Sequence, residues 1–376
     1  MRAISNSFSA FGLCAFSLIV TVASVSAVPI SDATTASLGQ SCTEVLLPIT
    51  VEQSAAGEFS LESYDVNVLF ALAERQTLAS NTYNISMRIC TPSANHVVPG
   101  HADTVQVLVH GATFNKIMWD LPYQPERYSW TKKMNEAGYA TIAVDLVGAG
   151  NSSFPNGLLE AQTATYVEVM HQVVLQLRAG TLYPERQWSK IVFVGFSIGG
   201  IVANSLAERY PSDVDVMVLL GISWELHWIY PAFMAGLQDA ARNIDPARWG
   251  ALPGFYQTHP TLATREVACF YGAYDHGALE ADFANRDFDT LGAAVTFTFH
   301  LVTAPVFSGP VFMGIGENDG TFCGVKCGSE PYEVYDKFPA ASTHDIRVYP
   351  DTGHMLLFHY SGMQMMDDVL TFLASV

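Results

Sequence analysis

Short apolar runs alternate with stretches of helical pattern from about residue 105 to the end of the chain. Each run is rich in Val and Ile, as strands buried on both faces are. The alternation of strands with helices predicts an α/β fold, with a mostly parallel central sheet and helices on both of its faces. The predicted strands are Val105 to Val109, Ala140 to Val144, Ile191 to Val194, Val214 to Leu220, Val311 to Ile315 and Ile346 to Val348.

The N-terminal part has a different pattern. Residues 28 to 41 are small and polar and are expected to be loose, and two further strand-like runs follow, Glu44 to Val51 and Tyr83 to Cys90. We therefore divide the chain into an N-terminal segment, residues 28–98, and an α/β core made of two parts, residues 99–223 and 305–376.

One connection in the predicted core is too long for a simple loop and helix. About 90 residues separate Leu220 from Val311, where a few would suffice. The interval is crowded with aromatic residues, which either hold it together or also roof a pocket. We expect residues 224–304 to form a mostly helical cap over the strand ends, inserted before the strand that carries the acidic residue discussed below.

The strongest chemical signal is the pattern G-x-S-x-G at Gly195 to Gly199. An apolar strand precedes it and a helical segment, Gly200 through Glu208, follows it. This context predicts a sharp strand-to-helix turn that presents Ser197 as a nucleophile. The backbone N–H of Ile198 then points into the site at a helix N-terminus, where a developing negative charge is stabilised.

A second arm of the oxyanion hole is expected from the loop after Val109. His110 and Gly111 begin this loop, and Gly111 lets the backbone approach a substrate closely. Ala112 is the first choice for the N–H donor and Thr113 the second. We interpret His110 as a structural histidine that bonds within its own loop.

The general base is expected on the loop that follows the last predicted strand. His354 follows Gly353 there and can fold back towards Ser197, and His359 is the alternative. For the acid that orients the imidazole we choose Asp319, because the order Ser197, Asp319, His354 is typical of this arrangement.

Two other carboxylates compete with Asp319 for the role of acid. Glu317 lies on the same turn, and Glu225 follows the preceding predicted strand. Sequence alone leaves these alternatives open.

Composition changes the picture mainly by exclusion. Asp and Glu total 36 against 18 Lys and Arg, which gives a net charge of -18. An acidic surface of this size argues against nucleic acid or anionic membranes as partners. Paired His and Cys spacings typical of zinc are absent from the sequence, as is a complete dinucleotide-binding loop, so we expect neither a metal nor a cofactor.

The N-terminus is typical of a signal peptide. Arg2 precedes an apolar run from Phe8 to Val25, and small residues follow up to Ala27, after which cleavage is expected. The alternative is an uncleaved signal anchor, because the run approaches the length of a membrane span. After removal of residues 1–27 no stretch could cross a membrane, and the protein is expected to be secreted.

The cysteines and two glycosylation sequons agree with export. We expect disulfides between Cys42 and Cys90 and between Cys323 and Cys327, which leaves Cys269 as the odd thiol. The pairing is a hypothesis, since sequence does not fix connectivity. The sequons place candidate glycosylation sites at Asn84 and Asn151.

Together these motifs resemble the α/β-hydrolase superfamily, and more closely its secreted fungal members that carry a cap. The resemblance covers the chain from about residue 100 onwards and implies hydrolysis of carboxylic esters through an acyl-enzyme. Phe196 departs from the His or Tyr common in relatives. The matching pieces are His110-Gly111, Asp145-x-x-Gly148-x-Gly150-x-Ser152, Gly195 to Gly199, Gly316 to Asp319 and Gly353-His354.

Three functional hypotheses follow from this reading. The first is a secreted carboxylesterase or lipase-like enzyme that acts on a small, apolar ester. The second keeps the same residues but makes the protein an acyltransferase or thioesterase of fungal secondary metabolism, and peptidase action also stays open. The third is an inactive binding module. Substrate, chain-length preference and oligomeric state are not readable from the sequence.

Overall fold

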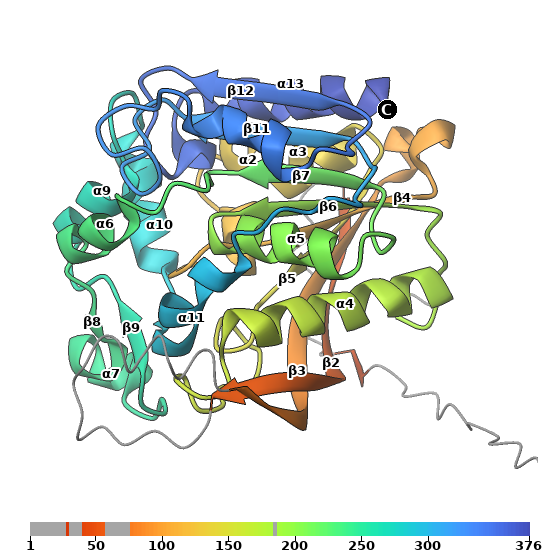
Figure 1. The fold of residues 1–376 in the computed structure, drawn as a ribbon. Helices are drawn as coiled ribbons and strands as arrows, with labels where there is room; N and C mark the ends of the chain where they lie inside the picture. The colour runs from red at the N-terminus through yellow and green to blue at the C-terminus, as the bar shows by residue number, and fades with distance from the viewer. Residues whose placement is uncertain (1–27, 30–39, 57–75, 183–185) are drawn as a thin grey trace, which may run out of the picture.

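The computed structural model describes residues 28–29, 40–56, 76–182 and 186–376. The predicted signal peptide therefore lies outside the described residues, as does most of the segment expected to be loose. Over the described residues the model has a large mixed sheet, a smaller antiparallel sheet, and helices on both faces of the large one (Figure 1).

The predicted α/β fold is confirmed. In the described chain the large sheet has the order β1-β2-β3-β5-β4-β6-β7-β11-β12, and the six strands from β5 to β12 along this order are parallel to one another. The strands are β1 Val28–Pro29, β2 Gln40–Ala56, β3 Gln76–Pro92, β4 Thr104–Val109, β5 Ala140–Val144, β6 Lys190–Phe196, β7 Val216–Leu220, β11 Val311–Gly316 and β12 His344–Tyr349.

The six strands predicted for the core match these bounds closely. The differences reach two residues at one end: β12 begins at His344 rather than Ile346, β6 ends at Phe196 rather than Val194, and β7 begins at Val216 rather than Val214. Asp215, just before it, uses its carboxylate to accept hydrogen bonds from the backbone N–H of Ile191 at 2.6 Å and from Arg178 at 2.6 Å. Because these bonds hold the Asp215 side chain just before the strand, β7 begins at the residue that follows Asp215.

The N-terminal strands β2 and β3 form a long antiparallel pair that joins the parallel part of the sheet through β5. They are longer than the runs predicted from Glu44 and Tyr83. Cys42 and Cys90 face each other in this register and form the first predicted disulfide.

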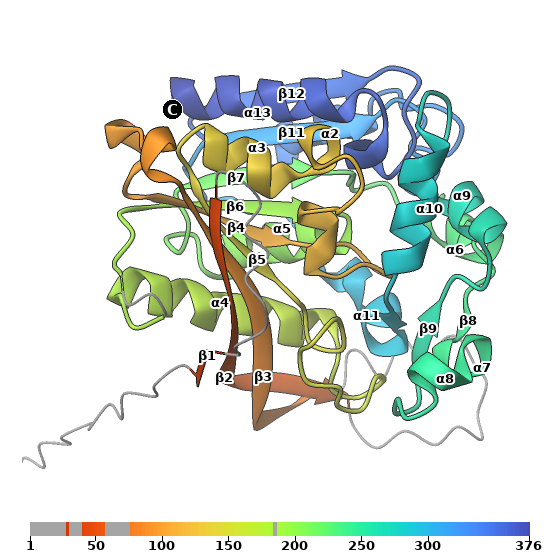
Figure 2. The ribbon, with the colours of Figure 1, turned by 180° about the vertical axis from the view of Figure 1, so that it is seen from behind.

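Helices cover both faces of the sheet (Figures 1 and 2). The helices α4 and α5 lie on one face, and α2, α3 and α13 on the other. The helices of the core are α2 Pro125–Tyr128, α3 Trp130–Glu136, α4 Thr163–Ala179, α5 Ile198–Arg209, α12 Val334–Lys337 and α13 Gly362–Ser375. Short 3₁₀ turns are η1 Ala94–His96, η2 Pro99–His101, η3 Lys116–Trp119, η4 Phe297–His300, η5 Glu330–Glu333 and η6 Leu356–Phe358.

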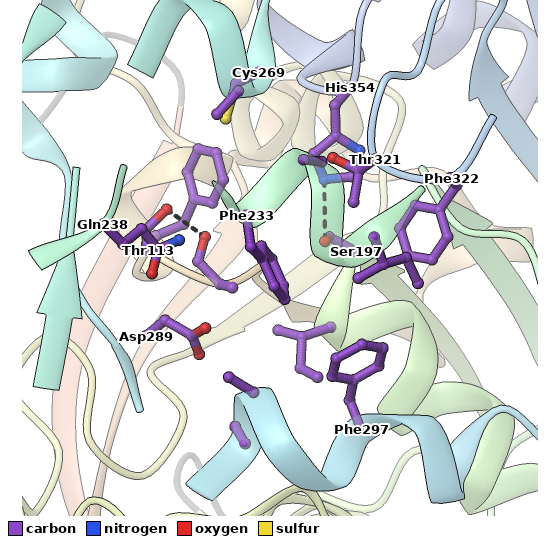
Figure 3. A pocket seen from close by; sticks show the side chains of 18 of the residues that line it. Thr113, Ser197, Phe233, Gln238, Cys269, Asp289, Phe297, Thr321, Phe322 and His354 are labelled. Atoms are coloured by element: carbon purple, nitrogen blue, oxygen red, sulfur yellow. Dashed lines mark hydrogen bonds between the residues drawn. The ribbon is translucent and has the colours of Figure 1, made fainter. Parts of the chain in front are cut away.

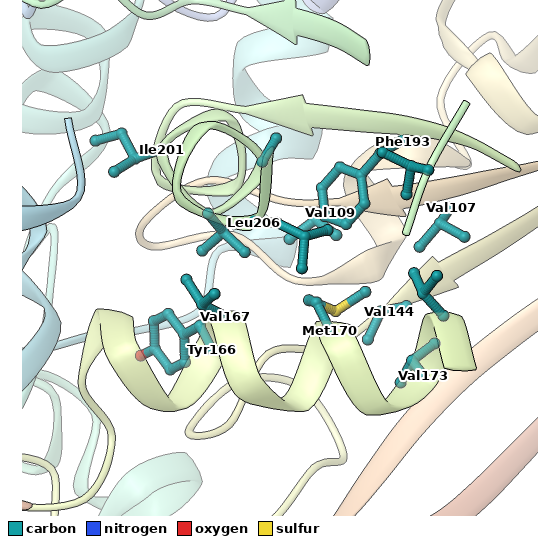
Figure 4. Close-up of a cluster of buried hydrophobic side chains, with 14 of the residues drawn as sticks. Val107, Val109, Val144, Tyr166, Val167, Met170, Val173, Phe193, Ile201 and Leu206 are labelled. Carbon is teal, nitrogen blue, oxygen red and sulfur yellow. The ribbon is translucent and has the colours of Figure 1, made fainter. Parts of the chain in front are cut away.

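Alternate strand residues feed two separate hydrophobic cores. Val107 and Val109 of β4 belong to the core under α4 and α5, which Figure 4 shows, whereas Leu108 belongs to the core on the opposite face. All three side chains are fully buried. This is why apolar residues predominate at successive positions of the central strands: neither face of this part of the sheet meets water.

The insertion between β7 and β11 contains short helices and also a small antiparallel sheet of order β10-β9-β8. The expectation of a mostly helical segment missed this sheet, because strands of two or three residues leave no alternation to read. Its elements are α6 Ile229–Ala235, β8 Asp239–Ala240, α7 Ala241–Ile244, α8 Pro246–Trp249, β9 Tyr256–Thr258, α9 Leu262–Cys269, α10 His276–Asn285, β10 Asp289–Thr290 and α11 Leu291–Thr296.

The two disulfides close loops of very different length, with sequence separations of 48 and 4. Cross-links restrict the unfolded chain more when the loop is long. We predict that Cys42→Ala with Cys90→Ala lowers the free energy of unfolding by about 2–4 kcal/mol in urea denaturation. The Cys323→Ala, Cys327→Ala pair should cost less; an equal or larger loss would show that loop length does not set the effect.

Candidate active site

Ser197 lies at a sharp turn between β6 and α5, with φ of 54° and ψ of -119°. A positive φ is unfavourable for a residue with a side chain and persists only where the surroundings enforce it. Here they do: the Ser197 N–H donates to the carbonyl of Leu220 at 2.9 Å, and the Ser197 carbonyl accepts from Gly200 and Ile201 of α5.

The two glycines of the motif make this turn possible by close backbone approach. A Cβ on Gly199 would lie 2.2 Å from the carbonyl oxygen of Val109, and one on Gly195 would lie 2.2 Å from that of Gly199. Both distances are far below van der Waals contact. The G-x-S-x-G spacing is thus a steric requirement of the turn.

The structure brings the predicted nucleophile, base and acid together. The Nε2 atom of His354 lies 3.1 Å from the Ser197 hydroxyl, and its Nδ1 atom lies 2.8 Å from a carboxylate oxygen of Asp319. All three side chains are buried. When Nδ1–H donates a hydrogen bond to Asp319, Nε2 is unprotonated and can accept the Ser197 proton. This is the tautomer that a general base needs.

The side chain of Asp319 is oriented by hydrogen bonds within its own turn. Its second oxygen accepts the backbone N–H groups of Thr321 at 3.0 Å and Phe322 at 3.1 Å. The disulfide between Cys323 and Cys327 closes the loop directly after these donors. The carboxylate therefore has a fixed orientation towards His354.

The two competing carboxylates are engaged elsewhere. Glu317 pairs with Lys326 at 2.8 Å and is partly exposed. Glu225 accepts the N–H of Leu226 at 2.8 Å and contacts the His227 ring. Hydrogen bonding to those neighbours lowers the pKa of both carboxyls. Of the three, Asp319 is the carboxylate that contacts His354.

His359 is the alternative base, but it has a different set of contacts. Its Nδ1 atom donates to the carbonyl of Met355 at 2.7 Å, and its Nε2 atom accepts the N–H groups of Gly353 at 3.1 Å and Tyr271 at 3.2 Å. Burial lowers the pKa of this ring. His359 therefore fixes the backbone of the loop that presents His354.

The backbone N–H groups predicted to form the oxyanion hole differ in the acceptors that they already have. The Ile198 N–H is the first of α5, so helix geometry gives it no acceptor within the helix. The Thr113 N–H donates to the carbonyl of Phe288 at 3.0 Å, so the second-choice donor is already used. Ala112 lines the pocket beside Ser197, which leaves its N–H as the better candidate of the two.

The loop of Ala112 is clamped by residues of the insertion. Besides the Thr113 to Phe288 bond, the Asp287 N–H donates to the carbonyl of Thr113 at 2.9 Å. Arg265, fully buried on α9, donates to the Thr113 hydroxyl and lies 4.0 Å above the ring of Phe114.

The charge of Arg265 is balanced by Asp282, with contacts of 2.7 and 2.9 Å. Such a paired geometry compensates the cost of burying both ions. The insertion thus sets the position of the loop that carries Ala112.

His110 is structural, as expected. Its Nδ1 atom donates to the Gly111 carbonyl at 2.8 Å, and its Nε2 atom accepts the Leu146 N–H at 3.0 Å. Asp145, which the sequence did not assign to the chemistry, is fully buried and pairs with Lys116 at 2.6 Å. Both residues hold the loops behind the site.

A pocket leads from Ser197 into the insertion (Figure 3). Most of its lining is apolar, which is typical of sites for small molecules. The apolar lining includes Ile198, Ile201, Ile229, Ala232, Phe233, Ala293, Ala294, Phe297 and Phe322. Apart from Ser197, His354 and the neighbouring loop residues, the polar lining consists of Gln238, His259 and Asp289.

Sequence reasoning missed these last three residues, as well as Arg265. Asp289 sits in the run Arg-Asp-Phe-Asp, which reads as an ordinary charged surface segment. Only the pairing of β10 with β9 turns it inward. Burial raises its pKa to about 7. Burial, with Arg265 nearby, lowers the pKa of His259 well below its usual value.

Of the remaining predicted residues, Cys269 lines the pocket, whereas the two sequon residues do not. Asn84 and Asn151 are both exposed, and their segments meet, since the Asn84 N–H donates to the Ser153 hydroxyl at 2.9 Å. Glycosylation of either stays a prediction. The second predicted disulfide is present, and Cys269 is a buried free thiol whose pKa burial raises to about 12.

In the described part of the chain, no group of His, Cys, Asp and Glu is arranged to hold a metal ion. None of the helices described is both long and apolar enough to span a bilayer.

The fold and this site define an α/β hydrolase. A family model described as "Alpha/beta hydrolase family" matches residues 106–367, well over half of the chain. The chain belongs to that family.

Individual relatives share about a quarter of their residues with this chain over the aligned segments, with identities of 24%, 26% and 27%. The chain is 24% identical to a probable lysophospholipase, BODYGUARD 1, of Arabidopsis thaliana over 51% of this chain and 38% of that protein. It is 26% identical to methyl jasmonate esterase 1 of Vitis vinifera over 36% of this chain and 48% of that protein. It is 27% identical to carboxylesterase YbfK of Bacillus subtilis over 43% of this chain and 49% of that protein. In each case the match spans less than half of the relative.

Solved structures support the fold. A thermophilic esterase from Thermogutta terrifontis superposes with a TM-score of 0.54 at 15% identity, over 88% of this chain and 98% of that one. An α/β-hydrolase-fold protein from Chitinophaga pinensis gives 0.53 at 16% identity, over 79% and 95%.

We predict that His359→Ala lowers kcat by about tenfold or more, because a small displacement of His354 is enough to disturb proton transfer. His359→Gln, which can keep one acceptor for the backbone N–H groups, should recover part of the rate. Steady-state kinetics beside thermal unfolding would test this. Full activity in His359→Ala would show that the loop carrying His354 keeps its position without the hydrogen bonds of His359.

Asp289 makes stability depend on pH. Its pKa is about 7 in the folded state, against an ordinary value of 3.8, so between these values the folded chain binds more protons than the unfolded one. Stability therefore falls as pH rises through this window, and the loss is complete above about pH 7.

We predict that Asp289→Asn is stabilising relative to wild type at pH 8, on the order of 2–4 kcal/mol, and less so at pH 5. Urea denaturation at both values would measure the difference. Asp239→Asn, at an exposed carboxyl of the same small sheet, is the matched control. A difference that does not change with pH would contradict the buried-carboxyl account.

Proposed function

We propose that this protein is a serine hydrolase that cleaves carboxylic esters. The observation that carries the proposal is the hydrogen-bonded chain from Ser197 through His354 to Asp319 at one end of a largely apolar pocket. Family membership and the esterase names of several relatives agree with ester hydrolysis. The reaction needs a nucleophile, a base and an acid that orients the base, and Ser197, His354 and Asp319 can supply these three groups.

In this proposal His354 takes the proton of Ser197 while the Ser197 oxygen attacks the ester carbonyl. The oxyanion that forms accepts hydrogen bonds from the N–H groups of Ile198 and Ala112. His354 then gives the proton to the leaving alcohol, and an acyl group remains on Ser197. A water molecule, deprotonated by His354, releases the acid and restores the serine.

The proposal extends to the surroundings in which the enzyme works. We propose that the chain is exported and glycosylated, with residues 1–27 as its signal. The two disulfides and the exposure of Asn84 and Asn151 support export, since disulfides persist in oxidising compartments. The resemblance to secreted fungal enzymes points the same way.

The triad proposal predicts a sharp contrast between neighbouring carboxylates. Asp319→Asn should lower kcat for p-nitrophenyl esters by about 10³-fold or more, because the imidazole loses its orienting charge. Glu317→Gln and Glu225→Gln should keep wild-type rates within about twofold, since both side chains contact other groups. If Asp319→Asn stayed active and one of the two glutamate variants lost most of its activity, that glutamate would be the acid of the triad instead of Asp319.

A further inference from the structure

The pocket proposed to bind the ester has one buried carboxyl among apolar neighbours. Asp289 is only 6% exposed, lines the same pocket as Ser197, and lies across it from the serine in Figure 3. Phe233 and Phe297 also line this part of the pocket. A carboxyl in such surroundings is costly unless it has strong partners.

Asp289 has few partners among the residues that the structure describes. Its carboxyl interacts with the backbone N–H of Thr290 and the side chain of Gln257. Within the described residues it takes part in no ion pair, whereas the similarly buried Asp282 is paired with Arg265 at 2.7 Å. The buried carboxylate of Asp282 is thus neutralised by an ion pair, whereas the carboxyl of Asp289 faces the pocket without one.

Gln238 is a second incompletely bonded group in the same pocket. One end of its amide lies 3.4 Å from His259, and the other end is buried with no hydrogen-bond partner among the described residues. The unbonded atom of Gln238 is its Oε1, which accepts a hydrogen bond, while the Asp289 carboxyl accepts one as the anion and donates one when protonated. A ligand group that both donates and accepts hydrogen bonds is therefore complementary to the two side chains. A hydroxyl is the smallest group of this kind.

Charge favours a hydroxyl over an ammonium at this place. His259 lines the pocket, and burial together with the charges of Arg265 and Arg286 disfavours the protonated form of its ring, so a cationic ligand group beside it would be disfavoured in the same way. A neutral hydroxyl also costs less to transfer into an apolar pocket than an ion.

We propose that Asp289 binds a hydroxyl group of the substrate, so that the enzyme prefers hydroxylated esters to alkyl esters of the same size. The inference rests on the proposed ester hydrolysis and names its substrate class. Asp289 acts here in binding and takes no part in the bond that breaks. A site built to hydrogen-bond a hydroxyl discriminates strongly against an analogue that lacks it, because buried polar groups then stay unpaired.

The test compares isosteric ester pairs. One arm uses methyl esters of ω-hydroxy fatty acids against methyl esters one carbon longer, over several chain lengths. The other arm places the hydroxyl in the alcohol part, with ω-hydroxyalkyl acetates against alkyl acetates one carbon longer. Rates are followed by acid release and normalised to active sites titrated with a fluorophosphonate.

We expect wild type to prefer the hydroxylated member, in kcat/KM, by about tenfold or more in at least one arm. Asp289→Leu should remove or reverse this preference, and Asp289→Asn should reduce it. Asp239→Asn, an exposed carboxyl of the same small sheet, should keep it. No preference in either arm, or a preference that survives in Asp289→Leu, would overturn the inference.

A second measurement covers the case in which Asp289→Leu does not fold. Short alkanediols should slow fluorophosphonate labelling of wild type more than alkanols of the same length, and Asp289→Asn should narrow that difference. Equal protection by diols and alkanols would contradict the inference. Failure of the proposed function itself would look different, because wild type would then neither react with the fluorophosphonate nor hydrolyse any ester.

Discussion

The site depends on one strained residue. Ser197 has a left-handed φ that its side chain disfavours, and the turn exists because Gly195 and Gly199 let three backbone segments approach within distances that a Cβ would forbid. The turn points the serine away from β6 and starts α5 at Ile198, so one piece of local geometry places both the hydroxyl and an N–H at the helix start. The buried sheet around it supplies the packing that holds this conformation.

The other groups of the site come from distant segments that are each fixed by backbone hydrogen bonds. Asp319 is set by the N–H groups of its own turn, and His354 by the loop that His359 ties down. Ala112 sits on a loop clamped by Arg265 and by the backbone of Asp287 and Phe288. The insertion therefore shapes the proposed oxyanion hole as well as the pocket, and its buried Asp289 is a stability cost that a substrate-binding role would explain.

The sequence was sufficient wherever the signal was local. The apolar strands and the G-x-S-x-G turn follow from residue type and spacing, since the sheet is buried on both faces and the turn needs its glycines. Choices between close neighbours were not readable: Asp319 and Glu317 share one turn, and only their contacts in three dimensions separate them.

The same limit applies to Thr113, whose N–H is used by Phe288 from a segment far along the chain. It applies also to Asp289, which faces inward because two very short strands pair.

We propose Ser197 as the residue that attacks the ester carbonyl. To test this, the purified protein is treated with a fluorophosphonate and the adduct is located by tandem mass spectrometry of its peptides. We expect a single stoichiometric adduct on Ser197 that is absent from Ser197→Ala. An adduct on another residue, or unchanged labelling of Ser197→Ala, would contradict it.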